Sequence, residues 1–176
     1  MLVTPPLIQW GLAFGRRQPE EDGPAPLPRT ADHLPPQATV FGLGPVGRNV
    51  ASRFETQGYD VGLVDRSPLN LVAFAQQGFR TATGDGHDPQ VLETIEAHRS
   101  RIVAICLPDD EVACQLVEVL RRINPETLIV VRCRFVSNQS RLKALGAHAV
   151  VSEEAVATLA LTRKLDELAE AQGDGR

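Results

Sequence analysis

Six short apolar runs alternate with helical patterns along residues 38–151, and this alternation constrains the fold more than any other feature of the sequence. The runs are rich in β-branched residues and nearly continuous in apolar character, which is typical of strands buried on both faces of a parallel sheet. They span residues 39–41, 61–64, 80–83, 102–106, 128–131 and 149–151. The alternation predicts a doubly wound α/β domain with right-handed crossovers and strand order 3-2-1-4-5-6.

Capping residues and glycines predict helices between these runs. Ser67-Pro68, Asp88-Pro89 and Pro108-Asp109 supply capping side chains or prolines at helix starts. Glycines at positions 58, 78 and 146 stand where a left-handed residue commonly ends a helix. Residues 152–172 predict an additional C-terminal helix with more apolar surface than a solvent-facing helix needs: Val156, Leu159, Leu161, Leu165 and Leu168. This surface packs either on its own domain or at a dimer interface.

The composition is that of a soluble globular protein with one domain. Of 176 residues, 43% are hydrophobic and 23% are charged. The net charge of −4 argues against a nucleic-acid partner, which usually requires a strongly basic protein. Cys106, Cys114 and Cys133 form no CxxC pair and are expected in the core, with a redox-sensitive Cys106 as the alternative. The histidines lack metal-ligand spacing, so no metal site is expected.

The first 37 residues differ in character from the rest. Residues 1–17 form an apolar stub ending in Arg16 and Arg17, which is too short to cross a bilayer by itself. The stub fits the last part of a transmembrane helix whose arginines mark the cytoplasmic side, and an amphipathic or disordered leader is the alternative. Residues 18–37 contain six prolines and predict a semi-rigid linker before a domain at 38–170.

The motif Gly42-Leu43-Gly44-Pro45-Val46-Gly47 follows the first strand and opens the first predicted helix. In such a GxGxxG loop the glycines permit a tight turn, close approach of a pyrophosphate and close helix–strand packing, in that order. Amides at the helix start attract an anion, and because Pro45 has no N–H, Val46 and Gly47 are expected to donate. The motif predicts a Rossmann-like nucleotide site, with a glycine turn that only packs the helix as the alternative.

Asp65 ends the second strand, 18 residues after Gly47. A carboxylate at this position accepts hydrogen bonds from the ribose hydroxyls of a dinucleotide. Its negative charge would repel a 2′-phosphate. The expected ligand is therefore NAD(H) or an adenine nucleotide (AMP, ADP or ATP), and NADP is disfavoured.

Residues after other strands are expected at the same edge of the sheet, where a crevice opens between the first and fourth strands. The candidates are Gly84, Asp85, Gly86, Leu107 and Arg66. Asp85 is expected to bind the adenine amino group or a ribose, with a helix-capping or turn role as the alternative. Arg66 is expected to stack on adenine or approach a phosphate, with simple solvation as the alternative.

A basic cluster between residues 121 and 143 is opposed by a single acidic residue, Glu126. Phosphates, an acidic partner or a membrane surface would suit such a cluster. Ordinary solvation with scattered ion pairs is favoured, since exposed pairs contribute little free energy. The cluster consists of Arg121, Arg122, Arg132, Arg134, Arg141 and Lys143.

With these motifs in place, residues 38 to about 168 resemble the N-terminal nucleotide-binding part of an RCK domain, also called TrkA-N or KTN. The matching motifs, in chain order, are VFGLGPVG, LVDRSP, TATGDGHDPQVLE, IVAICLPDD, INPETLIVVRCR and RLKALGAHAVV. The stub MLVTPPLIQWGL is similar to the end of the last membrane helix in Kef-type monovalent cation:proton antiporters.

The resemblance implies a regulatory domain and not an enzyme. Domains of this family form dimers through helices, bind NAD(H), AMP or ATP, and gate a potassium transporter or channel at the cytoplasmic face of the membrane. Many members have arginine where Pro45 stands, so one phosphate contact is missing here. The small C-terminal ligand-binding subdomain and the membrane part lie outside these residues, so no site that they carry is expected.

The alternative function is a small NAD-dependent oxidoreductase, or an enzyme subunit completed by a partner. A dehydrogenase needs a substrate pocket and a proton-transfer group besides its cofactor fold. Only 25 residues follow Val151, which leaves no room for a substrate domain. Tyr59 is the only tyrosine, and Leu63 stands where short-chain reductases have lysine. No catalytic residue is therefore assigned.

Overall fold

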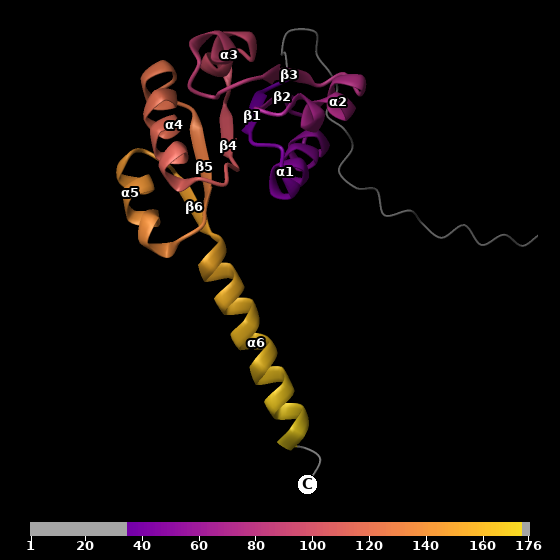
Figure 1. Ribbon diagram of the computed structural model, residues 1–176, viewed down its shortest axis with the longest axis vertical. Coiled ribbons are helices and arrows are strands. Elements are labelled where there is room, and N and C mark those ends of the chain that lie inside the picture. Colours follow the sequence, from indigo (N-terminus) through magenta and orange to yellow (C-terminus); the bar gives the residue numbers. More distant parts are fainter. Residues whose placement is uncertain (1–34, 174–176) are drawn as a thin grey trace, which may run out of the picture. The chain divides into compact units, whose positions relative to one another are not determined.

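The structure, a computed structural model, describes residues 35–173 (Figure 1). The predicted stub at 1–17 lies outside the described residues, and so does the predicted linker except for residues 35–37. The first strand begins at Gln37, which the sequence places at the end of the linker. Between residues 35 and 173, no helix is both long enough and apolar enough to span a bilayer.

Six parallel strands form one sheet in the order β3-β2-β1-β4-β5-β6, which confirms the predicted topology (Figure 1). The strand order reverses between β1 and β4, because β2 and β3 follow on one side of β1 whereas β4, β5 and β6 lie on the other. This reversal opens a crevice at the carboxyl ends of β1 and β4. The predicted runs match the strands to within two residues at each end. The strands are β1 (Gln37–Phe41), β2 (Asp60–Asp65), β3 (Arg80–Thr83), β4 (Ile102–Ile105), β5 (Leu128–Cys133) and β6 (Ala149–Ser152).

The helices follow the predicted capping signals. The side chains of Asp88 and Asp109 cap α3 and α4 by accepting backbone amides, whereas Ser67 precedes α2 without a side-chain hydrogen bond. Gly58, Gly78 and Gly146 all have positive φ angles after helix ends, as expected. The helices are α1 (Pro45–Thr56), α2 (Pro68–Gln76), α3 (Pro89–Thr94), α4 (Asp110–Ile123), α5 (Gln139–Ala144) and α6 (Glu153–Gly173), with short 3-10 turns η1 (Ala97–Arg99) and η2 (Val136–Asn138).

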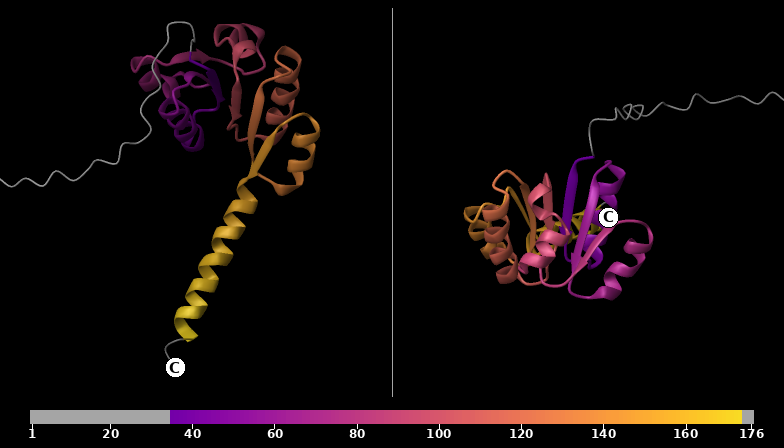
Figure 2. Two further views of the ribbon diagram at one scale, coloured as in Figure 1. Left: turned by 180° about the vertical axis from the view of Figure 1, so that it is seen from behind. Right: turned by 90° about the horizontal axis from the view of Figure 1, so that it is seen from above.

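Helices flank the sheet (Figure 2), and its two faces carry separate apolar cores. On one face α1 and α2 pack through Ala51, Phe54 and Leu71 against β1, β2 and β4. On the other face α3, α4 and α5 cover the sheet, with fully buried side chains such as Leu116 and Leu142. The three cysteines are free and buried, which confirms their expected core role.

Within residues 35–173, the part of the first face that lies beyond α1 is not covered by a helix. An apolar groove of about 640 Å³ lies there, lined by α1, β4, β5 and the first turns of α6. Helix α6 leaves the sheet after β6 and extends away from it (Figure 1). All of its described side chains beyond Glu153 are exposed, including Leu159 at 73% and Leu165 at 65%. The domain thus exposes apolar surface both in the groove and on α6.

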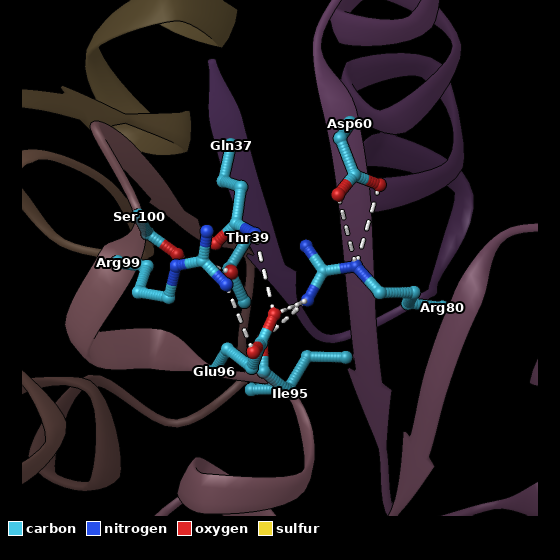
Figure 3. Close-up of polar contacts among 8 residues, drawn as sticks. All are labelled: Gln37, Thr39, Asp60, Arg80, Ile95, Glu96, Arg99 and Ser100. Atoms are coloured by element: carbon cyan, nitrogen blue, oxygen red, sulfur yellow. Dashed lines mark hydrogen bonds and ion pairs between the residues drawn. The ribbon is translucent and has the colours of Figure 1, made fainter. Parts of the chain in front are cut away.

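Polar contacts join the amino ends of β1, β2 and β3 (Figure 3). Arg80 at the start of β3 donates hydrogen bonds to Asp60 at the start of β2 and to Glu96. Gln37 of β1 also donates to Glu96, and hydrogen bonds from Gln37 and Arg99 lower the pKa of the Glu96 carboxyl. This network fixes the sheet edge opposite to the one at which parallel sheets bind ligands.

The buried hydroxyl pair beside this network provides a test of the packing (Figure 3). The Oγ1 of Thr39 and the Oγ of Ser100 are 2.7 Å apart, and both residues are almost fully buried. Thr39→Val should lower the free energy of unfolding by about 1–2 kcal/mol, because the Ser100 hydroxyl loses its partner. Adding Ser100→Ala should recover most of that loss in urea denaturation. A double variant less stable than the single one would contradict the assignment.

Candidate functional site

A cleft of about 450 Å³ opens at the carboxyl edge of the sheet, where the sequence predicts a crevice. Its walls come from the loops after β1, β2, β3 and β4. Three predicted site residues do not line it: Leu43 and Gly47, which are buried, and Val46, which lines the apolar groove. The nine predicted residues that do line it are Gly42, Gly44, Pro45, Asp65, Arg66, Gly84, Asp85, Gly86 and Leu107.

The three glycines of the loop have different surroundings. Gly42 has a φ of +89°, and a Cβ there would lie 2.9 Å from the carbonyl oxygen of Cys106. A Cβ on Gly47 would lie 1.8 Å from the carbonyl oxygen of Gly42, so α1 approaches the loop as closely as a glycine permits. A Cβ on Gly44 would meet no protein atom within 4 Å. Gly42 and Gly47 therefore serve the packing, and Gly44 leaves the cleft side of the loop open.

The start of α1 presents unused hydrogen-bond donors. Within residues 35–173, the amides of Gly44, Val46 and Gly47 have no acceptor. Gly44 is the N-cap and has no side chain to accept from them, Pro45 is the first helical residue, and the first turn contains no acidic residue. Among the described residues no side chain accepts these amides, so the positive end of the helix dipole favours an anion at this place.

Asp65 holds the glycine loop against β2 as well as facing the cleft. Its Oδ2 accepts the Leu43 amide at 2.6 Å, and its Oδ1 accepts the Ser67 amide at 2.8 Å and the Asn70 amide group at 3.1 Å. Arg48 completes this support by donating to the Leu43 carbonyl at 2.8 Å and to Asn70 at 3.0 Å. These contacts use three of the roughly four acceptor positions of a carboxylate.

Arg66 and Asp85 form an ion pair of 2.6 Å between the loops after β2 and β3. Asp85 also accepts the backbone amide of His87 at 3.0 Å, and its carboxylate lies 2.7 Å from the His87 Nδ1. Hydrogen bonds from the His87 backbone and ring, with a contribution from Arg66, lower the pKa of Asp85 to about 2. The turn role considered for Asp85 is present, and its carboxylate is ionised in the cleft wall at neutral pH.

Arg132 lines the cleft, although the sequence places it only within a basic cluster. It stands near the carboxyl end of β5, and its side chain is 20% exposed. Asn70, in the first turn of α2, also lines the cleft and was not among the predicted residues. For both residues, the only signal in the sequence is the position along the chain. Asn70 lies near the start of α2 and Arg132 near the end of β5, and both of these ends lie at the ligand-binding edge of the sheet.

Two other members of the basic cluster, Arg121 and Arg141, have structural contacts elsewhere. Arg121 donates to the backbone carbonyls of Gly146, Pro125 and Thr127. Arg141 pairs with Glu111 on the surface. The cluster therefore does not form one anion-binding patch, and Arg132 alone of its members contributes to the cleft.

The reactive groups around the cleft are poorly suited to catalysis. Burial raises the pKa of the Cys106 thiol to about 11, so this thiol is protonated at neutral pH and is a weak nucleophile. The ionised Asp85 is a poor proton donor. Among the described residues, no group of three or more histidine, cysteine or acidic side chains is placed to hold a metal ion.

These features fit a nucleotide. The start of α1 lies in the cleft wall, where the amide of Gly44 is free within residues 35–173 and the helix dipole attracts a phosphate. A carboxylate stands at the end of β2, as a ribose requires, and the apolar side chains of Phe41, Val64, Leu107 and Val112 supply a surface for a base. The fold and the site define a Rossmann-like domain of the nucleotide-binding class.

The sequence of residues 38–153 matches the model of the TrkA-N domain family. This match covers more than half of the 176 residues. The chain therefore belongs to the TrkA-N domain family, and the resemblance noted from its motifs is confirmed.

Among curated proteins, the chain is similar to the glutathione-regulated potassium-efflux system protein KefC of Escherichia coli O139:H28. The two are 23% identical over 115 residues, which cover 65% of this chain and 18% of that protein. The chain thus spans less than a fifth of the length of this relative.

Two solved structures share the fold. The Shewanella denitrificans Kef CTD in its AMP-bound form is 24% identical, with a TM-score of 0.61, covering 78% of this chain and 88% of that one. The GsuK channel bound to NAD is 21% identical, with a TM-score of 0.58, covering 68% of this chain and 22% of that one.

The different roles of the loop glycines can be tested by alanine substitution. Gly47→Ala should lower the free energy of unfolding by about 3 kcal/mol or more, because its Cβ would overlap the Gly42 carbonyl. Gly44→Ala is the matched control and should change it by less than about 1 kcal/mol, since its φ is −65° and its Cβ meets open space. Chemical denaturation measures both, and equal losses would contradict the assignment.

Proposed function

We propose that this chain is a nucleotide-sensing regulatory domain that controls a Kef-type potassium or other monovalent cation:proton antiporter at the cytoplasmic face of the membrane. The observation that carries the proposal is the cleft at the strand-order reversal, whose wall contains both the start of α1, with the free amide of its N-cap Gly44, and the Asp65 carboxylate. The names of the relatives support it: KefC is a potassium-efflux system protein, and a Kef CTD binds AMP.

The ligand we propose is NAD(H) or an adenine nucleotide such as AMP, ADP or ATP. Support comes from the GsuK channel, which binds NAD, and from the Kef CTD. The Asp65 carboxylate would accept ribose hydroxyls either at its remaining acceptor position or in place of Asn70. Its charge disfavours the 2′-phosphate of NADP.

The ligand class is tested by calorimetric titration with NAD, NADH, AMP, ADP, ATP and NADP. The unsubstituted chain should bind NAD at least about tenfold more tightly than NADP, and Asp65→Asn should narrow this ratio because the repelling charge is removed. The ratio is informative because loss of the Asp65 contacts to the loop weakens both ligands alike. Equal affinity for the two dinucleotides in the unsubstituted chain would refute the role of Asp65.

The same titration tests the glycine loop. Gly44→Ala places a methyl group where a phosphate would approach the backbone, yet it meets no protein atom within 4 Å. It should therefore weaken nucleotide binding by about tenfold or more while leaving the fold intact. Unchanged affinity in this variant would mean that the phosphates do not contact the loop.

A regulatory role is favoured over the oxidoreductase alternative. The groups near the cleft include a protonated Cys106 thiol and an Asp85 carboxylate with a pKa of about 2, and neither is matched to proton transfer at neutral pH. Bound NADH should accordingly be stable in the presence of candidate carbonyl substrates. Turnover of NADH would favour the alternative.

We further propose that the domain forms a homodimer in which α6 of one copy lies in the apolar groove of the other. Within the described residues α6 has exposed apolar side chains along its length, and the groove is uncovered over β4 and β5. Val156, Ala157 and Ala160 already form one wall of the groove, so a second α6 would extend an apolar surface that begins with the first. Large exposed apolar patches of this kind mark interaction sites.

Dimerisation is tested by sedimentation equilibrium. Val156→Asp should weaken the dimer by about tenfold or more, because it places a charge in the wall of the groove. Thr158→Asp is the matched control on the same exposed helix, outside the groove wall, and should change the dimer little. A monomeric unsubstituted chain at high micromolar concentration would refute the dimer.

The regulatory signal would be a change in the arrangement of this dimer. A nucleotide shifts such an equilibrium only if it binds the two arrangements with unequal affinity. The dimerisation constant should therefore change when AMP or NAD is added.

A further inference from the structure

Arg132 lies between the cleft and the start of α6. Among the described residues, it is the only charged one that lines both the nucleotide cleft and the apolar groove. β5, which carries it, is hydrogen-bonded to β4 on one side and to β6 on the other, and α6 follows β6 directly. Its side chain is only one-fifth exposed, so the position of its guanidinium is set by the protein.

The contacts of the guanidinium join these two parts of the domain. Its Nε donates to Glu153, the first residue of α6, at 2.6 Å. Its Nη1 donates to the carbonyl oxygen of Leu107 in the cleft wall at 3.0 Å. Within residues 35–173 its Nη2 has no acceptor. The Glu153 hydrogen bond raises the pKa of Arg132 and lowers that of Glu153, so both groups are charged at neutral pH.

The cleft has few other sources of positive charge. In the part of the chain that the structure describes, its only other lining cation is Arg66, whose side chain is 68% exposed and is paired with Asp85. Pro45 contributes neither a side-chain charge nor a backbone N–H at the start of α1. Gly42 lies beside the carbonyl of Cys106, and the Arg132 Nη1 is 3.5 Å from this same carbonyl. Among the described residues that line the cleft, Arg132 is therefore the one cation that is largely buried.

We propose that the phosphate of a nucleotide bound in the cleft and the carboxylate of Glu153 compete for Arg132. This inference rests on the proposed function. It assigns to Arg132 both the contact with the phosphate and the connection between the cleft and α6. An arginine fork binds a phosphate through two parallel hydrogen bonds, and both Nη2 and the nitrogen now paired with Glu153 are suited to it. As the phosphate takes the guanidinium, the first turn of α6 loses its ion pair, and the helix that lines the groove changes its anchoring.

The experiment compares AMP with adenosine, which differ only in the phosphate, by calorimetry on the full chain. Arg132→Gln should weaken AMP by about 10–100-fold and adenosine by less than about twofold. Glu153→Gln should tighten AMP by about 5–10-fold, because the competing charge is removed, and should leave adenosine unchanged. Glu154→Gln is the matched control, since this neighbouring carboxylate accepts the Val136 amide and does not contact Arg132.

The outcomes separate this inference from the proposed function. If the unsubstituted chain binds neither AMP nor NAD, the proposed function fails and this inference fails with it. If AMP binds but Arg132→Gln weakens AMP and adenosine in parallel, Arg132 only supports the fold, and the inference alone is overturned. If Arg132→Gln does not fold, the comparison of Glu153→Gln with Glu154→Gln tests the inference. Equal AMP affinity in these two variants would show that Glu153 does not compete with the phosphate for Arg132.

Discussion

The close approach of the start of α1 to the loop after β1 is the constraint on which the site depends. A Cβ on Gly47 would lie 1.8 Å from the Gly42 carbonyl, so only glycine permits the helix to begin this near the sheet. This packing leaves the first amides of α1 without acceptors within the described residues and places them at the strand-order reversal. A partial positive charge at a crevice follows from the packing of two glycines and does not need a basic side chain.

Helices cover the two faces of the sheet unequally, and this determines which apolar surfaces of the domain are exposed. α3, α4 and α5 bury one face, whereas α1 and α2 bury only part of the other. The remaining part forms the groove, and α6 extends away from the sheet (Figure 1). Burying apolar area stabilises by roughly 25 cal/mol per Å², so the exposed apolar side chains of α6 and the apolar groove would favour the association that we propose.

Much of the fold could be predicted because its signals are local. The apolar runs mark the strands, and Gly58, Gly78 and Gly146 end helices with positive φ angles. The site was less accessible from sequence, because side-chain contacts depend on the tertiary structure. Asp65 was assigned from its spacing, but its hydrogen bond with the Leu43 amide forms only when β2 lies beside the loop. Arg132 cannot be told from sequence apart from neighbouring basic residues such as Arg121, which binds backbone carbonyls, and Arg141, which pairs with a surface carboxylate.

The typical free energy of regulatory coupling is better matched by one exchange of the hydrogen-bond partner of Arg132 than by a large rearrangement of the core. Regulatory couplings are typically about 1–3 kcal/mol. A hydrogen bond to a charged group contributes about 1.5–3 kcal/mol, so forming one such bond to a phosphate while breaking one at α6 involves free energies of the same size. The apolar cores on both faces of the sheet are close-packed and resist continuous deformation. The proposed change in the anchoring of α6 would therefore require less free energy than a rearrangement of the cores, and it would act on the surface through which we propose that a second copy binds.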